Sequence, residues 1–173
     1  AHIALDETSV SLVSSQPIGA VPHLAMFLRA AEARGFAWGD LSGTSQNDFL
    51  METAITIAPE ALPPAASFRL ACDLAEFTTE HLPRWNPVSV SGYNYREAGA
   101  TAPLELALTI AHGQAVAREL ARRGVEPESF LPRLTFFLCA HNDLFREVAK
   151  MRAARRMWST WVAEELGISD EKA

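Results

Sequence analysis

Apolar and polar positions along the chain follow two alternating patterns. Four segments carry apolar side chains at helical spacing, and shorter runs of β-branched and small residues stand before each of them or between them. The predicted helices are residues 22–34, 67–81, 103–123 and 143–166, and the predicted strands are residues 7–13, 41–46, 88–93 and 132–138. Strands that alternate with helices predict an α/β fold with a parallel sheet of about four βα units.

One stretch, residues 86–102, combines a strand, a polar loop and the start of a helix. Its polar run Tyr93, Asn94, Tyr95 and Arg96 directly follows the predicted strand. In parallel α/β folds, the residues just past the carboxyl end of a strand line the ligand site. We therefore expect these four side chains at a functional site.

Composition narrows the class of protein. The 173 residues are 49% hydrophobic, which predicts a packed core in a single domain or part of one, spanning residues 1–173. The net charge of −6 disfavours a general nucleic-acid binder. No apolar run approaches the roughly 20 residues of a membrane span, and Cys72 and Cys139 lie in apolar contexts typical of reduced thiols. We predict a cytoplasmic protein.

The sequence offers no phosphate-binding motif and only an incomplete metal-binding pattern. The chain has no Gly-rich phosphate-binding loop of the dinucleotide or P-loop type. Cys139, His141 and Asp143 alternate, so on a strand they share a face on which a metal can bind. No fourth residue nearby has ligand-like spacing, so the sequence alone favours no metal site.

Six segments carry a family resemblance. They are IALDETSVS (residues 3–11), LSGTSQNDFL (41–50), PRWNPVSVSGY (83–93), REAGATA (96–102), PRLTFF (132–137) and EVAKMRAARRMW (147–158). In these segments and in their order, the chain resembles the substrate-binding barrel of the cobalamin-dependent acyl-CoA mutases, the methylmalonyl-CoA mutase family. The resemblance covers nearly the whole chain.

This resemblance implies the central portion of a (β/α)8 TIM barrel whose interior is threaded by the CoA chain. It also implies adenosylcobalamin, which a domain or subunit outside this chain binds. The Asp-x-His-x-x-Gly signature, whose histidine ligates cobalt in relatives, is absent from residues 1–173, so we expect no cofactor on this chain alone. A partial barrel exposes unpaired strand edges. We therefore expect a missing barrel or cobalamin-domain chain, or a homo-oligomer, as partner, besides an acyl-CoA or acyl thioester, and neither nucleic acid nor membrane.

The resemblance also assigns site residues. Thr44, Ser45 and Gln46 match a loop that contacts the acyl part of the substrate, and Arg84 matches a basic position near it. Arg133 and Thr135 match an Arg-x-Ser pair that holds the CoA arm, and Tyr93 matches the tyrosine beside the reaction centre. An arginine suits a phosphate because its planar fork binds in two places.

Two positions depart from the family pattern. Asn94 stands where mutases carry a histidine that hydrogen-bonds the thioester carbonyl and supplies a proton; asparagine can donate but cannot titrate near neutral pH. Thr56 stands where methylmalonyl enzymes carry an arginine and isobutyryl-type enzymes a glutamine. A threonine cannot neutralise a carboxylate, so a dicarboxylic acyl-CoA is disfavoured.

Three functions remain open at this stage. The first is the substrate-binding portion of an isomerase that rearranges a carbon skeleton by a radical route, with Tyr93 and Asn94 as catalytic residues. The second is a divergent member that binds an acyl thioester, on CoA or a carrier protein, without cobalamin chemistry. The third is a scaffold without a ligand.

Several residues also have structural readings. Asn94 can satisfy a tight turn, Arg133 can form an ion pair at a strand start, and Gln46 can be a loop polar. Four basic residues at helical spacing indicate a solvated helix face, or alternatively a surface that contacts CoA phosphates or a partner subunit. This patch consists of Lys150, Arg152, Arg155 and Arg156.

Overall fold

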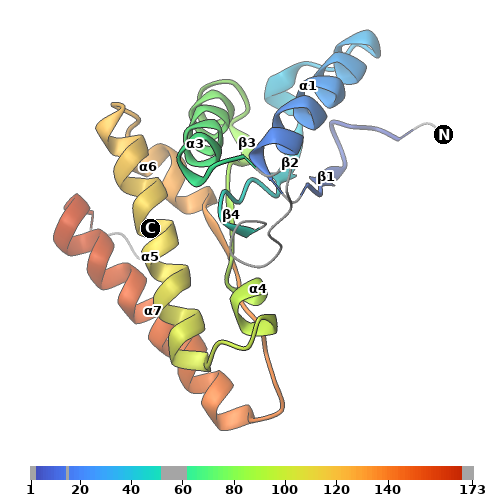
Figure 1. Ribbon diagram of the computed structural model, residues 1–173. Coiled ribbons are helices and arrows are strands. Elements are labelled where there is room, and N and C mark those ends of the chain that lie inside the picture. Colours follow the sequence, from blue (N-terminus) through green and yellow to red (C-terminus); the bar gives the residue numbers. More distant parts are fainter. Residues whose placement is uncertain (1–2, 15, 52–61, 169–173) are drawn as a thin grey trace. The chain divides into compact units, whose positions relative to one another are not determined.

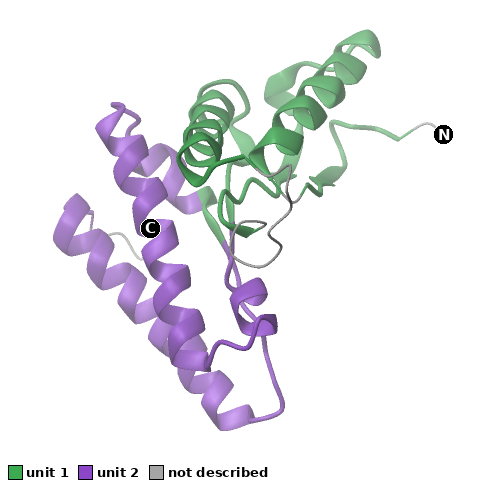
Figure 2. Ribbon diagram, in the orientation of Figure 1, with its two compact units in different colours: residues 1–89, 133–135 green, residues 90–132, 136–173 purple. Residues whose placement is uncertain are grey.

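A computed structural model describes residues 3–14, 16–51 and 62–168 of the chain (Figure 1). These residues fall into two compact units, one formed by residues 1–89 with 133–135 and the other by residues 90–132 with 136–173 (Figure 2). Thr56, with most of the predicted short helix and loop at 49–57, lies outside the described residues. None of the described helices has the length and apolar character needed to cross a membrane.

The first unit holds a three-stranded sheet and two long helices. Its elements are β1 (Ser9–Leu12), α1 (Pro17–Ala33), η1 (Trp38–Asp40), β2 (Ser42–Ser45), α3 (Pro64–His81) and β3 (Arg84–Asn86). The strands pair in the order β1-β2-β3, and both pairs are parallel. This confirms the predicted α/β class with parallel strands.

Prolines set the starts of both helices. Helix α1 begins at Pro17, five residues before the predicted start, and α3 begins at Pro64, three residues early. Proline is tolerated at the first helical position because the missing N–H has no intrahelical partner there. The prediction took Pro22 as the start of α1, whereas Pro22 lies inside the helix. Gly35, with φ of 84°, ends α1 as predicted.

One face of this sheet is apolar and packs on the helices. Val10, Gly43 and Trp85 stand side by side in the strand register. A Cβ on Gly43 would lie 2.2 Å from the Val10 carbonyl oxygen and 2.6 Å from the Trp85 ring, so only glycine fits under the indole. Leu24 of α1 and Leu74 of α3 belong to the same buried cluster as Trp85. This cluster is the core of the first unit.

The second unit is mainly helical. Its helices are α4 (Gly92–Glu97), α5 (Ala102–Arg122), α6 (Pro127–Phe130) and α7 (Leu144–Leu166). Helix α5 packs against α7, and both lie within one residue of their predicted bounds. A short helical turn, η2 (Leu131–Arg133), leads into β5 (Thr135–Phe137), which pairs with β4 (Ser89–Ser91) as a two-stranded sheet, and residues 89 and 133–135 of these elements belong to the first unit.

Two strand predictions were wrong in part. The strand predicted over 88–93 ends at Ser91, and the residues from Gly92 form the short helix α4. Gly92 is buried, and a Cβ there would lie 2.2 Å from the Thr109 hydroxyl of α5, so the chain passes closer to α5 than a side chain allows. The strand predicted as buried at 132–138 is only three residues long, and Phe137 in it is 49% exposed.

The described strands form one three-stranded and one two-stranded sheet. The predicted TIM barrel is therefore not confirmed, and the barrel stays a prediction. What the described residues do show is a mixed α/β chain with parallel strands.

Candidate functional site

Small polar side chains cover the face of the β1-β2-β3 sheet that points away from the core. The register places Ser9 beside Ser42, and Ser11 beside Thr44, which in turn stands beside Asn86. All of these side chains are half-buried or exposed. The hydroxyl and amide groups on this face can form hydrogen bonds with a polar ligand.

Gln46 extends this polar face past the carboxyl end of β2. Residues 42, 44 and 46 share one face because side chains alternate along a strand. The Gln46 N–H donates to the Leu12 carbonyl at 3.1 Å, which continues the ladder by one residue. Its half-buried side chain lies with Nε2 3.6 Å from the Met51 sulfur. Thr44 and Gln46 therefore lie on the same side, at the strand end where ligands usually bind.

Ser45 points to the opposite face. It is fully buried, and its hydroxyl accepts a hydrogen bond from the Trp85 indole at 3.1 Å. Of the three residues predicted in this loop, the structure thus brings together Thr44 and Gln46 and turns Ser45 into the core.

Arg84 begins β3, in register with Ser42 at the amino end of the sheet. Its guanidinium donates to the Asp40 carbonyl at 3.0 Å. Gln46 lies past the other end of the strands. The predicted substrate contact of Arg84 therefore gains no support from its place in the sheet.

Arg133 and Thr135, which belong to the first unit, hydrogen-bond backbone carbonyls of that same unit. The Arg133 guanidinium donates to the carbonyls of Leu82 and Trp85 at 3.0 and 2.9 Å. The Thr135 hydroxyl donates to the Val88 carbonyl at 3.2 Å. Burial lowers the pKa of Arg133. These bonds give Arg133 a structural role through backbone carbonyls rather than through the ion pair considered from the sequence, and a contact to CoA stays a prediction for both residues.

Helix α4 carries the candidate catalytic residues of the second unit. The Ser91 hydroxyl donates to Oδ1 of Asn94, which fixes the orientation of the amide and presents its nitrogen as a donor. Tyr93 is 38% exposed, and its ring stacks against Phe137 with 5.3 Å between centroids. A fixed amide donor thus lies next in sequence to an exposed aromatic surface.

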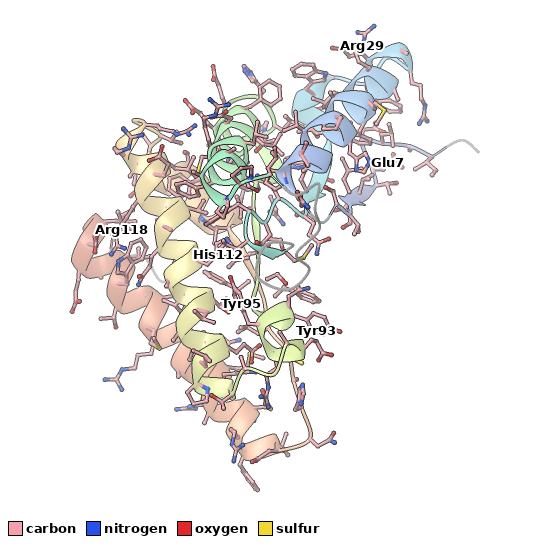
Figure 3. The ribbon with its side chains drawn as sticks, in the orientation of Figure 1. Glu7, Arg29, Tyr93, Tyr95, His112 and Arg118 are labelled. Carbon is pink, nitrogen blue, oxygen red and sulfur yellow. The ribbon has the colours of Figure 1, made fainter. Side chains whose placement is uncertain are left out.

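Two further polar residues of α4, Tyr95 and Arg96, make contacts within the second unit. Tyr95 points toward α5, where its hydroxyl lies 3.3 Å from Nδ1 of the buried His112 (Figure 3). Arg96 donates to the Ala100 carbonyl at 2.5 Å. The contact of Tyr95 ties α4 to α5, whereas Tyr93 and Glu97 of this helix are exposed and Asn94 is half-buried.

A buried ionic triad underlies this region and was missed from the sequence. Lys150 lies 2.6 Å from Glu105 of α5 and 2.5 Å from Glu147, and all three side chains are buried. The predicted solvated patch is therefore wrong for Lys150, whereas its three arginines are exposed. Glu147 and Lys150 share the helical face of Trp158 and Trp161, and that spacing was the signal in the sequence.

Helix α7 also carries an apolar stripe at helical spacing, which the sequence indicates as core or interface; it consists of Phe145, Val148, Met151, Trp158 and Trp161. Trp158 and Trp161 are buried, as a core reading requires. Phe145 is 86% exposed and Val148 is half exposed, so they are not core residues of this chain. Both cysteines are buried thiols, as predicted.

The chain is similar to proteins of one family. A model of the family described as methylmalonyl-CoA mutase matches residues 1–173. The methylmalonyl-CoA mutase large subunit of Streptomyces virginiae is 42% identical over 162 residues, which are 94% of this chain and 22% of that protein. The mitochondrial methylmalonyl-CoA mutase of Bos taurus is 37% identical over 171 residues, or 99% of this chain and 22% of that protein.

A third relative matches this chain with similar identity and coverage. The probable mitochondrial methylmalonyl-CoA mutase of Caenorhabditis elegans is 38% identical over 99% of this chain and 23% of its own length. The chain thus spans about a fifth of the length of the curated relatives it matches. Because the match extends over every residue, the chain belongs to the methylmalonyl-CoA mutase family.

Proposed function

We propose that this chain forms part of the acyl-CoA site of a mutase-type isomerase, which rearranges the carbon skeleton of its substrate. The observation that carries the proposal is the polar face of the β1-β2-β3 sheet. Its small hydroxyl and amide side chains suit the polar, extended arm of CoA better than a packed barrel interior does. Family membership supplies the reaction class.

Roles follow from the placement of each side chain. Thr44 and Gln46 orient the acyl group from the carboxyl end of β2. Asn94 donates its amide N–H to the thioester carbonyl, and Tyr93 covers the reacting carbons from the same helix. Thr135 and Arg133 remain candidate contacts to the CoA arm.

Adenosylcobalamin would supply the organic radical that starts the rearrangement. The cobalt-binding histidine signature of the family is not among residues 1–173, so we propose that another part of the protein or another subunit holds the cofactor. This chain's own residues bind, orient and shield the thioester. The strands missing from a closed barrel would come from that same part, or from a second copy of the chain. We keep the cytoplasm as the proposed compartment, which the two buried thiols support.

The binding role predicts the effect of Gln46→Ala. We expect the affinity of the intact protein for an acyl-CoA to fall about tenfold, because one hydrogen bond to the acyl group is lost. Isothermal titration calorimetry with short-chain acyl-CoAs measures this. Gln114→Ala, on α5, is the matched control and should bind as the unchanged protein does. Equal affinities for the two variants would contradict the placement of the acyl group beside β2.

A second candidate function rests on Asn94. An amide cannot deliver a proton near neutral pH, so the chain can belong to a member that binds an acyl thioester, on CoA or a carrier protein, and has lost the radical reaction. Thioester binding without any isomerisation, in the presence of adenosylcobalamin and all subunits, would favour this candidate.

Asn94→His separates the two candidates. In a working isomerase we expect the substitution to add a pH dependence to kcat between about pH 5 and 8, because an imidazole titrates there and an amide does not. The assay follows isomerisation of linear and branched acyl-CoAs by the intact protein with adenosylcobalamin. Asn94→Gln, which keeps an amide, is the control and should leave the shape of the pH profile unchanged. Absence of turnover in all three proteins would reject the isomerase.

A further inference from the structure

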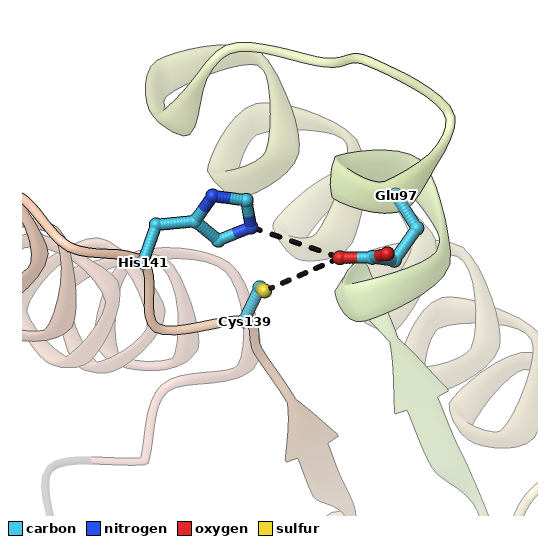
Figure 4. Close-up of side chains that lie close together, drawn as sticks. All are labelled: Glu97, Cys139 and His141. Atoms are coloured by element: carbon cyan, nitrogen blue, oxygen red, sulfur yellow. Dashed lines mark hydrogen bonds and ion pairs between the residues drawn. The ribbon is translucent and has the colours of Figure 1, made fainter.

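Three side chains with metal-binding atoms meet in the second unit. Glu97 ends α4, and Cys139 and His141 follow β5 (Figure 4). Glu97 Oε1 lies 3.8 Å from the Cys139 sulfur and 3.7 Å from Nε2 of His141, and the three ligand atoms all lie within 4.8 Å of one another. They come from two segments about forty residues apart in the sequence.

The spacing of these atoms fits a small tetrahedral cation. With metal bonds of about 2.0–2.1 Å to nitrogen and oxygen and about 2.3 Å to sulfur, ligand atoms of a tetrahedral zinc site stand roughly 3.4–3.6 Å apart. The two distances to Glu97 exceed this range by only a few tenths of an ångström. Small side-chain rotations of the exposed Glu97 and His141 can close the gap.

The buried triad holds the segment that carries two of the ligands. The Cys139 N–H donates to Glu105 at 2.8 Å, and the Cys139 carbonyl accepts from Lys150 at 2.7 Å. These two bonds fix the backbone of Cys139, and Figure 4 shows the side chains of Cys139 and His141 directed toward Glu97. Such outer contacts are typical of built metal sites.

Asp143, the third member of the alternating pattern in the sequence, is occupied elsewhere. Its carboxylate accepts from the Arg146 N–H at 3.2 Å as the N-cap of α7 and pairs with the Arg146 guanidinium at 3.3 Å. The partner that the sequence lacked is Glu97, which the fold brings from α4.

We propose that Glu97, Cys139 and His141 bind a divalent cation of the zinc class through three protein ligands, with a fourth position open to water. Thiolate, imidazole and carboxylate are the ligands that zinc takes in proteins. The cation replaces the proton of the Cys139 thiol, because the thiolate is the form of cysteine that binds metals. The bound cation ties the end of α4 to the segment after β5, and so fixes the helix that carries Asn94.

Cobalt(II) titration of the intact protein tests this proposal. We expect a thiolate-to-cobalt charge-transfer band in the near ultraviolet that disappears in Cys139→Ser. Cys72→Ser, which removes the other buried thiol, is the matched control and should keep the band. A band that survives Cys139→Ser, or no band in the unchanged protein, would overturn the site.

The two exposed ligands give an independent measurement, because their loss does not disturb the core. Glu97→Gln and His141→Ala should each weaken zinc affinity by about tenfold or more, since even outer-contact mutations cost that much. Competition with a chromophoric chelator measures the affinity. Unchanged affinity in both variants would mean that a thiol alone holds the ion, and would reject the three-ligand site.

Discussion

Replacing Lys150 with alanine should lower the free energy of unfolding by about 3–5 kcal/mol, because the change leaves two carboxylates buried without their cation. Lys150 bonds Glu105 and Glu147 and also the carbonyl of Cys139. All three charged side chains are almost fully removed from solvent. Chemical denaturation of the intact protein, followed by circular dichroism, measures the loss.

Arg152→Ala is the control for this experiment, since Arg152 lies two residues away on α7 and is exposed. It should change stability by less than about 0.5 kcal/mol. A Lys150→Ala variant as stable as Arg152→Ala would show that the triad is not buried in the protein. Such a result would also remove the support for the segment that carries Cys139.

The effect of Lys150→Ala should depend on pH. Hydrogen bonding to Lys150 holds the pKa of Glu147 below its ordinary value. A carboxyl with a depressed pKa stabilises the fold above the pKa it has when unfolded, about 4.3, and this stabilisation is lost as the pH falls through the folded value. The difference between Lys150→Ala and the unchanged protein should therefore shrink in acid.

At alkaline pH, the titration of Lys150 determines how the stability difference changes. Burial lowers the pKa of Lys150, and the hydrogen bonds that its ammonium donates to Glu105 and Glu147 raise it by more, so the net shift is upward. The stabilisation is complete below about pH 10 and is lost as the pH rises through the raised value. The variant should thus show its full deficit between the acidic and basic limits.

The sequence predicted the elements whose patterns are local. Helices α5 and α7 follow from apolar side chains at helical spacing, and Gly35 marks the end of α1. Helix α4 could not be predicted in this way. It depends on the close approach of Gly92 to Thr109, which are seventeen residues apart, and a propensity argument sees no such contact.

The burial of charged side chains was harder to predict from the sequence than the burial of apolar ones. Lys150 stands among arginines, and a basic run is usually a solvated face. The spacing of Glu147 and Lys150 with the buried tryptophans of α7 indicated a shared helical face, but the pairing of Lys150 with Glu105 on a neighbouring helix is contained in no local pattern. Glu97 was missed as a partner of Cys139 for the same reason.

The resemblance to the family named candidate residues but not their orientation. Strand alternation alone puts Thr44 and Gln46 on one face and Ser45 on the other, and this could have been read from the sequence once β2 was fixed. The amino-end position of Arg84 also follows from strand direction. The hydrogen bonds from Arg133 to the carbonyls of Leu82 and Trp85 could not be predicted, because these residues lie far from Arg133 in the sequence.

Trp85→Ala should destabilise the first unit by about 3–5 kcal/mol, because a large aromatic side chain leaves a cavity that its neighbours cannot fill. The Trp85 ring is fully buried, lies 5.5 Å from the Phe27 ring and covers Gly43. Its indole N–H also bonds Ser45, which is left with a buried hydroxyl when the ring is removed. Urea denaturation of the intact protein measures the change.

Trp85→Phe is the matched control, since it keeps an aromatic ring above Gly43 and removes the indole N–H. It should cost about 1–2 kcal/mol, the usual loss when one buried partner of a hydrogen bond is deleted. Equal losses in the two variants would assign most of the effect to the bond with Ser45 rather than to packing. Because β2 and β3 meet through this ring, Trp85→Ala should also weaken acyl-CoA binding at the polar face behind it, whereas Trp85→Phe should not.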